Sequence, residues 1–166
     1  DLKRIGRHVP VDLLLHVANL AIEIAQEGRE GSPVGTLFVV GDTEKVLELS
    51  KPMIFNPFRG YPEDERKITD PKVQESVKEL SRIDGAFIVK DTGVVHAAGM
   101  YLFPDGVNIT PIKGLGARHA AASAISENTN AIAITVSEST GTVRIFSCGK
   151  PIKTIRTYRP RTKKSA

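Results

Sequence analysis

The most constraining feature of this sequence is the nearly continuous apolar run from Ala131 to Val136, which ends at Ser137 and Glu138. A run of this kind is typical of a central strand whose two faces are both covered. Residues 36–40 have a similar β-branched content and predict a second buried strand. Such strands need helices on both faces of their sheet, so the sequence predicts an α/β fold.

Three stretches have the pattern of helices that could cover this sheet. Residues 11–27 keep an apolar helical period as far as Gly28, and a second apolar stripe predicts burial on two sides. Asp70 and Pro71 suit the N-cap and the first position of a second helix. Residues 120–126 are rich in alanine and predict a third helix.

Two pairs of apolar runs are each joined by a short turn and predict β-hairpins: residues 87–90 with 94–98, and residues 131–136 with 142–146. Hairpins are antiparallel, which excludes an all-parallel sheet. Residues 151–158 contain proline and charges that suit an edge strand. We therefore expect a mixed central sheet of about six to seven strands flanked by helices.

Three further expectations concern the less regular segments. Asp42 is placed to cap a short helix over residues 44–49. Residues 51–69 contain three prolines and a mixed-charge cluster and predict a long loop. Cys148 is the single cysteine, which excludes an internal disulfide and fits a reducing cytoplasm. Its position in a β-like run favours a buried structural thiol over a nucleophile.

Length and charge suit one globular domain. We expect a single domain over residues 1–155 and a basic, flexible tail over residues 156–166. Residues 150–166 hold seven of the 23 basic residues and no acidic one, which leaves 16 basic against 19 acidic residues in the rest of the chain. A solvated tail is favoured over a nucleic-acid contact. No apolar run approaches the ~20 residues of a membrane span, and no signal peptide is visible, so we expect a cytoplasmic protein without a membrane partner.

Asp84, Gly85 and Ala86 directly precede the strand predicted at residues 87–90. An acidic side chain at the start of a strand can face a cleft, and the small residues after it leave room for a ligand to reach the backbone. The alternative is a turn that uses the Asp-Gly pair for its backbone angles.

Gly114 and Gly116 precede the alanine-rich helix, whose N-terminus would suit a phosphate group. Arg118 and His119 fall in or near its first turn, where the helix dipole disfavours cations by ~0.3–1 kcal/mol each. A bound polyphosphate would reverse that sign, which favours an anion site. The alternative is that both side chains turn into solvent, just as Ser137 and Glu138 could be ordinary loop residues.

Four short motifs follow one another in this order: Asp84-Gly85-Ala86, Ala97-Ala98-Gly99-Met100-Tyr101-Leu102, Gly116-Ala117-Arg118-His119 and Ser137-Glu138-Ser139-Thr140-Gly141. Together they resemble the diadenylate cyclase domain family over roughly residues 11–150, and a single-domain chain with this pattern looks most like the archaeal branch. The sequence departs from the family at two positions. Ala117 stands where Thr is usual, and Ala120 stands where Arg is frequent.

The resemblance implies a cyclase that condenses two ATP molecules into 3′,5′-linked cyclic di-AMP and releases two pyrophosphates, with Mn²⁺ or Mg²⁺ as cofactor. Its implied roles are metal binding and activation of the 3′-hydroxyl for Asp84, a nucleotide-pocket lining for Gly85, Ala86, Gly116 and Ala117, adenine contacts for Leu102, triphosphate binding for Arg118 and His119, phosphate contact for Ser137, and metal binding for Glu138 and also His119.

A two-fold symmetric product made from two identical substrates implies a homodimer or larger homo-oligomer as the active species. Two other classes stay open. One is a non-catalytic ATP-binding regulatory module of the same fold. The other is a nucleic-acid-binding protein acting through its basic tail, which the few aromatics and the acidic body make unlikely.

Overall fold

The computed structural model describes residues 9–158 and contains one mixed sheet of seven strands in the order β2-β4-β3-β1-β5-β6-β7. The strands are β1 (Thr36–Val40), β2 (Ser50–Pro52), β3 (Ala86–Val89), β4 (Val95–Leu102), β5 (Ile132–Val136), β6 (Val143–Ser147) and β7 (Lys150–Ile155). Strands β1 and β3 pair in parallel, and the other neighbours pair antiparallel. Both predicted hairpins, the mixed sheet and the edge position of β7 are confirmed.

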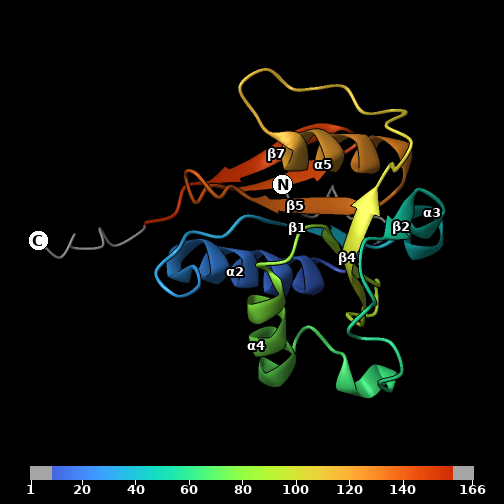
Figure 1. Cartoon of the computed structure of the whole chain (residues 1–166), viewed down its shortest axis with the longest axis vertical. Coiled ribbons are helices and arrows are strands. Elements are labelled where there is room, and N and C mark those ends of the chain that lie inside the picture. The colour runs from blue at the N-terminus through green and yellow to red at the C-terminus, as the bar shows by residue number, and fades with distance from the viewer. Residues whose placement is uncertain (1–8, 159–166) are drawn as a thin grey trace, which may run out of the picture.

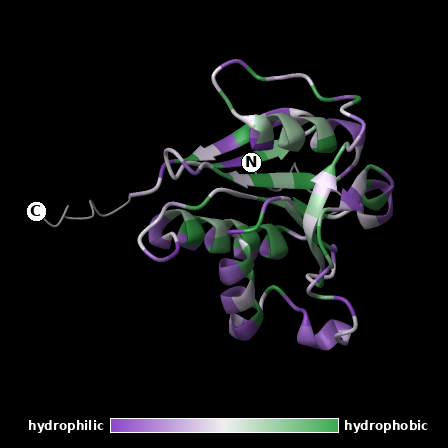
Figure 2. Cartoon of the chain, viewed as in Figure 1, coloured by the Kyte–Doolittle hydropathy of each residue, from purple (hydrophilic) through white to green (hydrophobic). Residues whose placement is uncertain are grey.

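Helices cover the two faces of this sheet, with α2 (Val11–Glu27) on one face and α5 (Ala117–Asn128) on the other (Figure 1). Side chains therefore alternate between two cores: Phe38 and Val40 of β1 join the core under α2, whereas Leu37 and Val39 join the core under α5. Every residue of β1 and β5 is buried, because both faces are covered. Apolar residues accordingly concentrate in the central strands and α2, whereas α3 (Thr43–Glu48) and α4 (Pro71–Leu80) are more hydrophilic (Figure 2).

The helix ends follow the predicted signals in two of three cases. Helix α2 has the predicted bounds, and helix α4 (Pro71–Leu80) begins after Asp70, whose side chain accepts a hydrogen bond from the Lys72 amide at 2.9 Å. Helix α5 begins at Ala117 and not at residue 120, so Arg118 and His119 lie inside its first turn. The alanine count alone marked the middle of this helix, whereas its start is set by the extended backbone of Gly116.

Three expectations are wrong in detail. Asp42 precedes the short helix α3 (Thr43–Glu48) but does not cap it with its side chain, because its backbone is left-handed and its carboxylate accepts a hydrogen bond from the Asn130 amide at 2.8 Å. Residues 51–69 are not one loop: β2 pairs with β4 at the start of this segment, and a 3₁₀ turn, η1, forms over Glu63–Glu65. Cys148 is exposed, since it lies in the tight turn between β6 and β7.

The expectations for the two ends of the chain lie partly outside the described residues. The structure describes only residues 156–158 of the predicted basic tail, and residues 159–166 fall beyond it. Within residues 9–158, none of the helices combines the length and the apolar character that crossing a membrane requires.

Candidate functional site

A cleft of about 1150 Å³ opens along one edge of the sheet, next to the N-terminus of α5. It lies at the amino ends of the parallel strands β1 and β3 and at the carboxyl ends of β4 and β5. In open parallel sheets ligands usually bind at the carboxyl ends of the strands. Here β4 and β5 run antiparallel to β3 and β1, so their carboxyl ends lie at the same edge as the amino ends of β1 and β3. The cleft still lies at carboxyl ends of strands, but these belong to β4 and β5.

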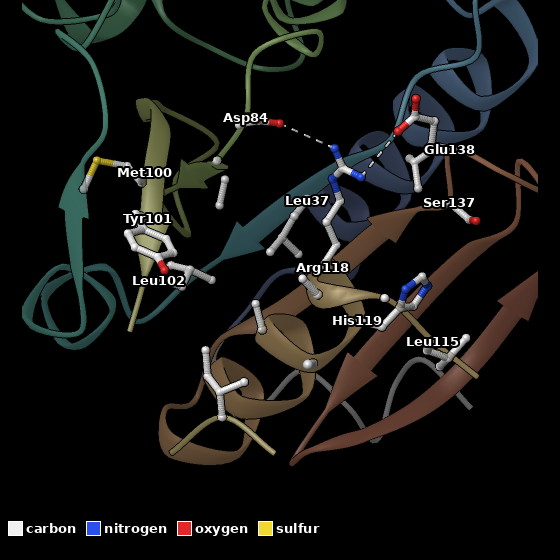
Figure 3. Close-up of a pocket in the computed structure, with 18 of the residues that line it drawn as sticks. Leu37, Asp84, Met100, Tyr101, Leu102, Leu115, Arg118, His119, Ser137 and Glu138 are labelled. Atoms are coloured by element: carbon white, nitrogen blue, oxygen red, sulfur yellow. Dashed lines mark ion pairs between the residues drawn. The ribbon is translucent and has the colours of Figure 1, made fainter. Parts of the chain in front are cut away.

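All ten residues singled out from the sequence line this cleft: Asp84, Gly85, Ala86, Leu102, Gly116, Ala117, Arg118, His119, Ser137 and Glu138. They come from four segments that are distant in sequence: the start of β3, the end of β4, the residues after β5 and the N-terminus of α5 (Figure 3). Met100, Tyr101 and Leu102 form one side of the cleft, and Ser137 and Glu138 lie at the opposite side (Figure 3). The structure thus brings the four motifs into one site.

Gly85 has a left-handed backbone with a φ of 103°, which favours glycine. A Cβ atom there would lie 2.7 Å from the carbonyl carbon of Gly99 and 2.8 Å from the amide nitrogen of Met100. The missing side chain therefore makes room for the backbone of β4. The preceding residue, Asp84, lines the cleft with a side chain that is 85% exposed.

The N-terminus of α5 faces the cleft without a side-chain cap. Its N-cap residue is Gly116, which offers no side chain, and the first turn contains no acidic residue. Gly116 and Ala117 are exposed and line the cleft. The positive end of a 12-residue helix therefore points amide groups at this space, as anion sites in proteins do.

Arg118 joins the separate motifs. Its guanidinium lies between two carboxylates, with Nη2 4.0 Å from Oδ1 of Asp84 and Nη1 3.9 Å from Oε2 of Glu138 (Figure 3). Both contacts are long and partly exposed, and ion pairs of this kind contribute little to stability. Arg118 can therefore give up a carboxylate contact and bind a phosphate at small cost. A guanidinium suits phosphate because it can donate two parallel hydrogen bonds to it.

His119 lines the cleft but is buried, with only 6% of its surface exposed. Its Nε2 lies 3.2 Å from Nη1 of Arg144 on β6, and its ring meets Phe146 edge to face. Because a guanidinium can only donate, Nε2 must accept, and the neutral ring then carries its proton on Nδ1. Arg144 was not among the residues predicted from the sequence. What places it in the site is the pairing of β5 with β6, which sets Arg144 opposite Thr135.

Burial lowers the pKa of His119 below its ordinary value of 6.5, and the charges of Arg144 and Arg118 lower it further. Above pH 6.5 the ring is neutral in both the folded and unfolded chain. Below that pH the unfolded chain binds the proton first, so the free energy of unfolding falls as the pH drops from 6.5 towards the folded pKa.

We expect His119→Gln, which cannot take up the proton, to weaken this acid-side loss of stability. Thermal unfolding between pH 5 and 8 measures it, with wild type and variant compared at each pH. His96 also has a pKa lowered by burial. His96 therefore contributes to the same acid-side loss, so the effect of His119→Gln is measured in a His96→Gln background as well; an acid-side slope that His119→Gln leaves unchanged in both backgrounds would contradict the assignment.

Among residues 9–158, no group of three or more His, Cys, Asp or Glu side chains is arranged to hold a metal ion. Asp84 and Glu138 lie on either side of the Arg118 guanidinium, and Nε2 of His119 faces Arg144. The part of the chain that the structure describes therefore contains no preformed three-ligand site. Two carboxylates remain a suitable donor set for Mg²⁺ or Mn²⁺, which commonly bind through one or two carboxylates together with substrate phosphates.

A sheet covered by helices on both faces, with an open helix N-terminus and an arginine in one cleft, defines a domain that can bind a nucleotide's phosphates. Residues 23–151 match the family model described as "DisA bacterial checkpoint controller nucleotide-binding", abbreviated DAC. The chain therefore belongs to this diadenylate cyclase domain family, and the resemblance seen in the sequence is confirmed.

Two curated archaeal proteins, both named diadenylate cyclase, are similar to this chain. The one from Methanocaldococcus jannaschii is 56% identical over 138 residues, which cover 82% of this chain and 43% of that protein. The one from Haloferax volcanii is 46% identical over 136 residues, which cover 82% of this chain and 49% of that protein. The chain thus spans about half the length of the curated relatives it matches.

Two solved structures share the fold. A double mutant of DacA from Staphylococcus aureus superimposes with a TM-score of 0.56 at 25% identity, covering 89% of this chain and 87% of that one. A protein from Bacillus cereus, titled a hypothetical membrane spanning protein, gives a TM-score of 0.61 at 21% identity, covering 90% of this chain and 65% of that one. The predicted fold class is confirmed.

Proposed function

We propose that this domain is a diadenylate cyclase, which condenses two ATP molecules into 3′,5′-linked cyclic di-AMP and releases two pyrophosphates. The names of the two archaeal relatives support this activity. The observation that carries it is the position of Arg118, at an open helix N-terminus and between the carboxylates of Asp84 and Glu138. In one cleft, Arg118 and the helix amide groups can bind phosphate, and a carboxylate can accept the proton of a hydroxyl group.

The reaction needs a 3′-hydroxyl that attacks the α-phosphate of a second ATP, with pyrophosphate as the leaving group. Asp84 is exposed to the cleft and accepts the hydroxyl proton. Arg118 and the amide groups at the start of α5 stabilise the negative charge that grows on the phosphates. Nδ1–H of His119 and the Ser137 hydroxyl donate further hydrogen bonds to the triphosphate.

The adenine base is expected on the apolar side of the cleft, against Leu102 and its neighbours Met100 and Tyr101. Gly85 and Ala86 line the space between base and phosphates, and Gly116 and Ala117 line the phosphate end. The volume of about 1150 Å³ exceeds the roughly 300–1,000 Å³ typical of small-molecule sites, so a whole nucleotide triphosphate fits.

A bound Mn²⁺ or Mg²⁺ would supply Lewis-acid polarisation of the phosphates. Asp84 and Glu138 would hold it with the substrate's own oxygens. His119 can join them only if its Nε2 leaves Arg144: either Nε2 then binds the metal, or Nε2 takes the proton and the lone pair of Nδ1 binds it.

One cleft per chain holds one ATP, so two chains must face each other for reciprocal attack. The active species is then at least a transient homodimer. We expect the specific activity to rise with protein concentration until the dimer is saturated. Initial rates across a dilution series, beside the mass measured at each concentration, check this; a rate per chain that is independent of dilution in a protein that stays monomeric would exclude the dimer.

The alternative function is an ATP-binding regulatory module without turnover. The presence of Asp84, Arg118, His119 and Glu138 argues against it, whereas the alanines at positions 117 and 120 leave room for it. Incubation with ATP and either Mn²⁺ or Mg²⁺, followed by chromatography with mass detection, separates the two. The cyclase produces cyclic di-AMP. The module binds ATP in equilibrium dialysis and returns it unchanged at every protein concentration tested.

A further inference from the structure

The position of Arg118 depends on the strand over which it lies. Strand β1 runs between β3 and β5, so its amino end separates Asp84, which precedes β3, from Glu138, which follows β5. The pairing of Phe38 with Phe87 brings the residues before these strands, Gly35 and Asp84, to the same edge. A guanidinium that contacts both carboxylates must therefore cross the start of β1.

Gly35 occupies that crossing point and is buried. A Cβ atom on Gly35 would lie 2.7 Å from Nη1 and 3.1 Å from Cζ of Arg118, and 3.0 Å from Cβ of Glu138. Separations below about 3 Å are too short for non-bonded heavy atoms, whose contacts are optimal at ≈ 3.5–4.0 Å. The guanidinium thus fills the space that any other residue would use for its side chain.

Backbone conformation does not explain this glycine. Most other glycines of the described chain have positive φ values, but Gly35 does not, so its backbone would accept an L-residue. Gly85 also has a close neighbour, but there the Cβ would meet backbone atoms of β4. At Gly35 the nearest atom is Nη1 of Arg118, at the end of a long side chain that can move away, and Cβ of Glu138 follows at 3.0 Å.

We propose that Gly35 is a positioning residue for Arg118: its missing Cβ holds open the place in which the guanidinium lies between Asp84 and Glu138. A side chain at this position displaces the guanidinium and leaves the fold intact. The consequence for turnover rests on the proposed cyclase function, whereas the steric coupling between Gly35 and Arg118 does not.

Gly35→Ala tests the proposal. We expect it to lower kcat/KM for cyclic di-AMP formation by about 10- to 100-fold, since a displacement near 1 Å of a positioned group can cost about 100-fold. We also expect a lower Tm. In an Arg118→Ala background the same substitution should lower the Tm by less and leave the residual activity unchanged, because the contacts with the guanidinium are gone and only the 3.0 Å contact with Cβ of Glu138 remains.

Gly31→Ala is the matched control. No atom lies within 4 Å of a Cβ at Gly31, and its φ of 77° disfavours alanine, so this variant lowers the Tm without touching Arg118. Its Tm loss should be the same in the wild-type and Arg118→Ala backgrounds. Equal Tm losses for Gly35→Ala in the two backgrounds, or full activity of Gly35→Ala, would overturn the proposal.

The two readouts separate this inference from the proposed function. If wild type makes no cyclic di-AMP, the cyclase proposal fails, and the Tm comparison still decides whether Gly35 and Arg118 are coupled. If wild type is active and the Tm losses are additive, the positioning role fails alone.

Discussion

Asp84→Asn is expected to reduce the rate of cyclic di-AMP formation by about 10²- to 10⁴-fold, the range that a general base typically contributes. The amide keeps the shape of the carboxylate but cannot accept the 3′-hydroxyl proton, and it offers a cation only a neutral carbonyl oxygen. Asp84 is 85% exposed and makes one long ion pair, so the substitution removes no packing. Initial rates at saturating ATP measure the loss, with product quantified by chromatography.

Unfolding and ATP binding provide the controls for Asp84→Asn. We expect a Tm close to that of wild type and an ATP affinity in the absence of metal that is equal or higher, since a negative charge near the phosphates is gone. Asp91→Asn serves as a matched substitution, because Asp91 is exposed in the turn between β3 and β4. A variant that keeps wild-type turnover would show that Asp84 is not the base.

Arg118→Ala is expected to lower kcat/KM by about 10²- to 10³-fold, as the loss of a donor to transition-state charge does elsewhere. Arg118→Lys should recover only a small part of this, because an ammonium group cannot contact two acceptors in the plane of a guanidinium. The expected change in the free energy of unfolding is within about 0.5 kcal/mol, since the two ion pairs are long and exposed.

Arg82→Ala is a closely matched control for Arg118→Ala. Arg82 is 39% exposed against 37% for Arg118, and it also contacts two carboxylates, those of Glu30 and Glu79. It lies outside the cleft lining. We expect Arg82→Ala to leave turnover unchanged. Equal activity losses in the two arginine variants would indicate a general charge effect and contradict a specific role for Arg118.

Local signals predicted much of this fold. The apolar run at residues 131–136 gave a strand buried on both faces because both faces are in fact covered, by α2 and α5. Helix α2 was predicted to the residue, because its apolar period ends at Gly28. Strand β2 was not predicted, because a strand of three residues containing proline has no periodicity of its own and forms only by pairing with β4.

The sequence predicted which residues line the site but not how they are arranged in space. All ten residues line one cleft, but the edge at which it lies follows from the parallel pairing of β1 with β3, which has no local signal. Gly35 and Arg144 lie next to Arg118 and His119 in contacts that join the sheet to α5. Contacts of this kind depend on strand order, which one sequence does not reveal. The roles of the ten residues remain predictions.

The most direct test of the cyclase proposal follows cyclic di-AMP and pyrophosphate together in one reaction of the wild-type protein with ATP and Mn²⁺ or Mg²⁺. The account predicts two pyrophosphates released for each cyclic di-AMP formed, throughout the time course. ATP that binds but is recovered unchanged, or pyrophosphate released without cyclic di-AMP, would contradict it.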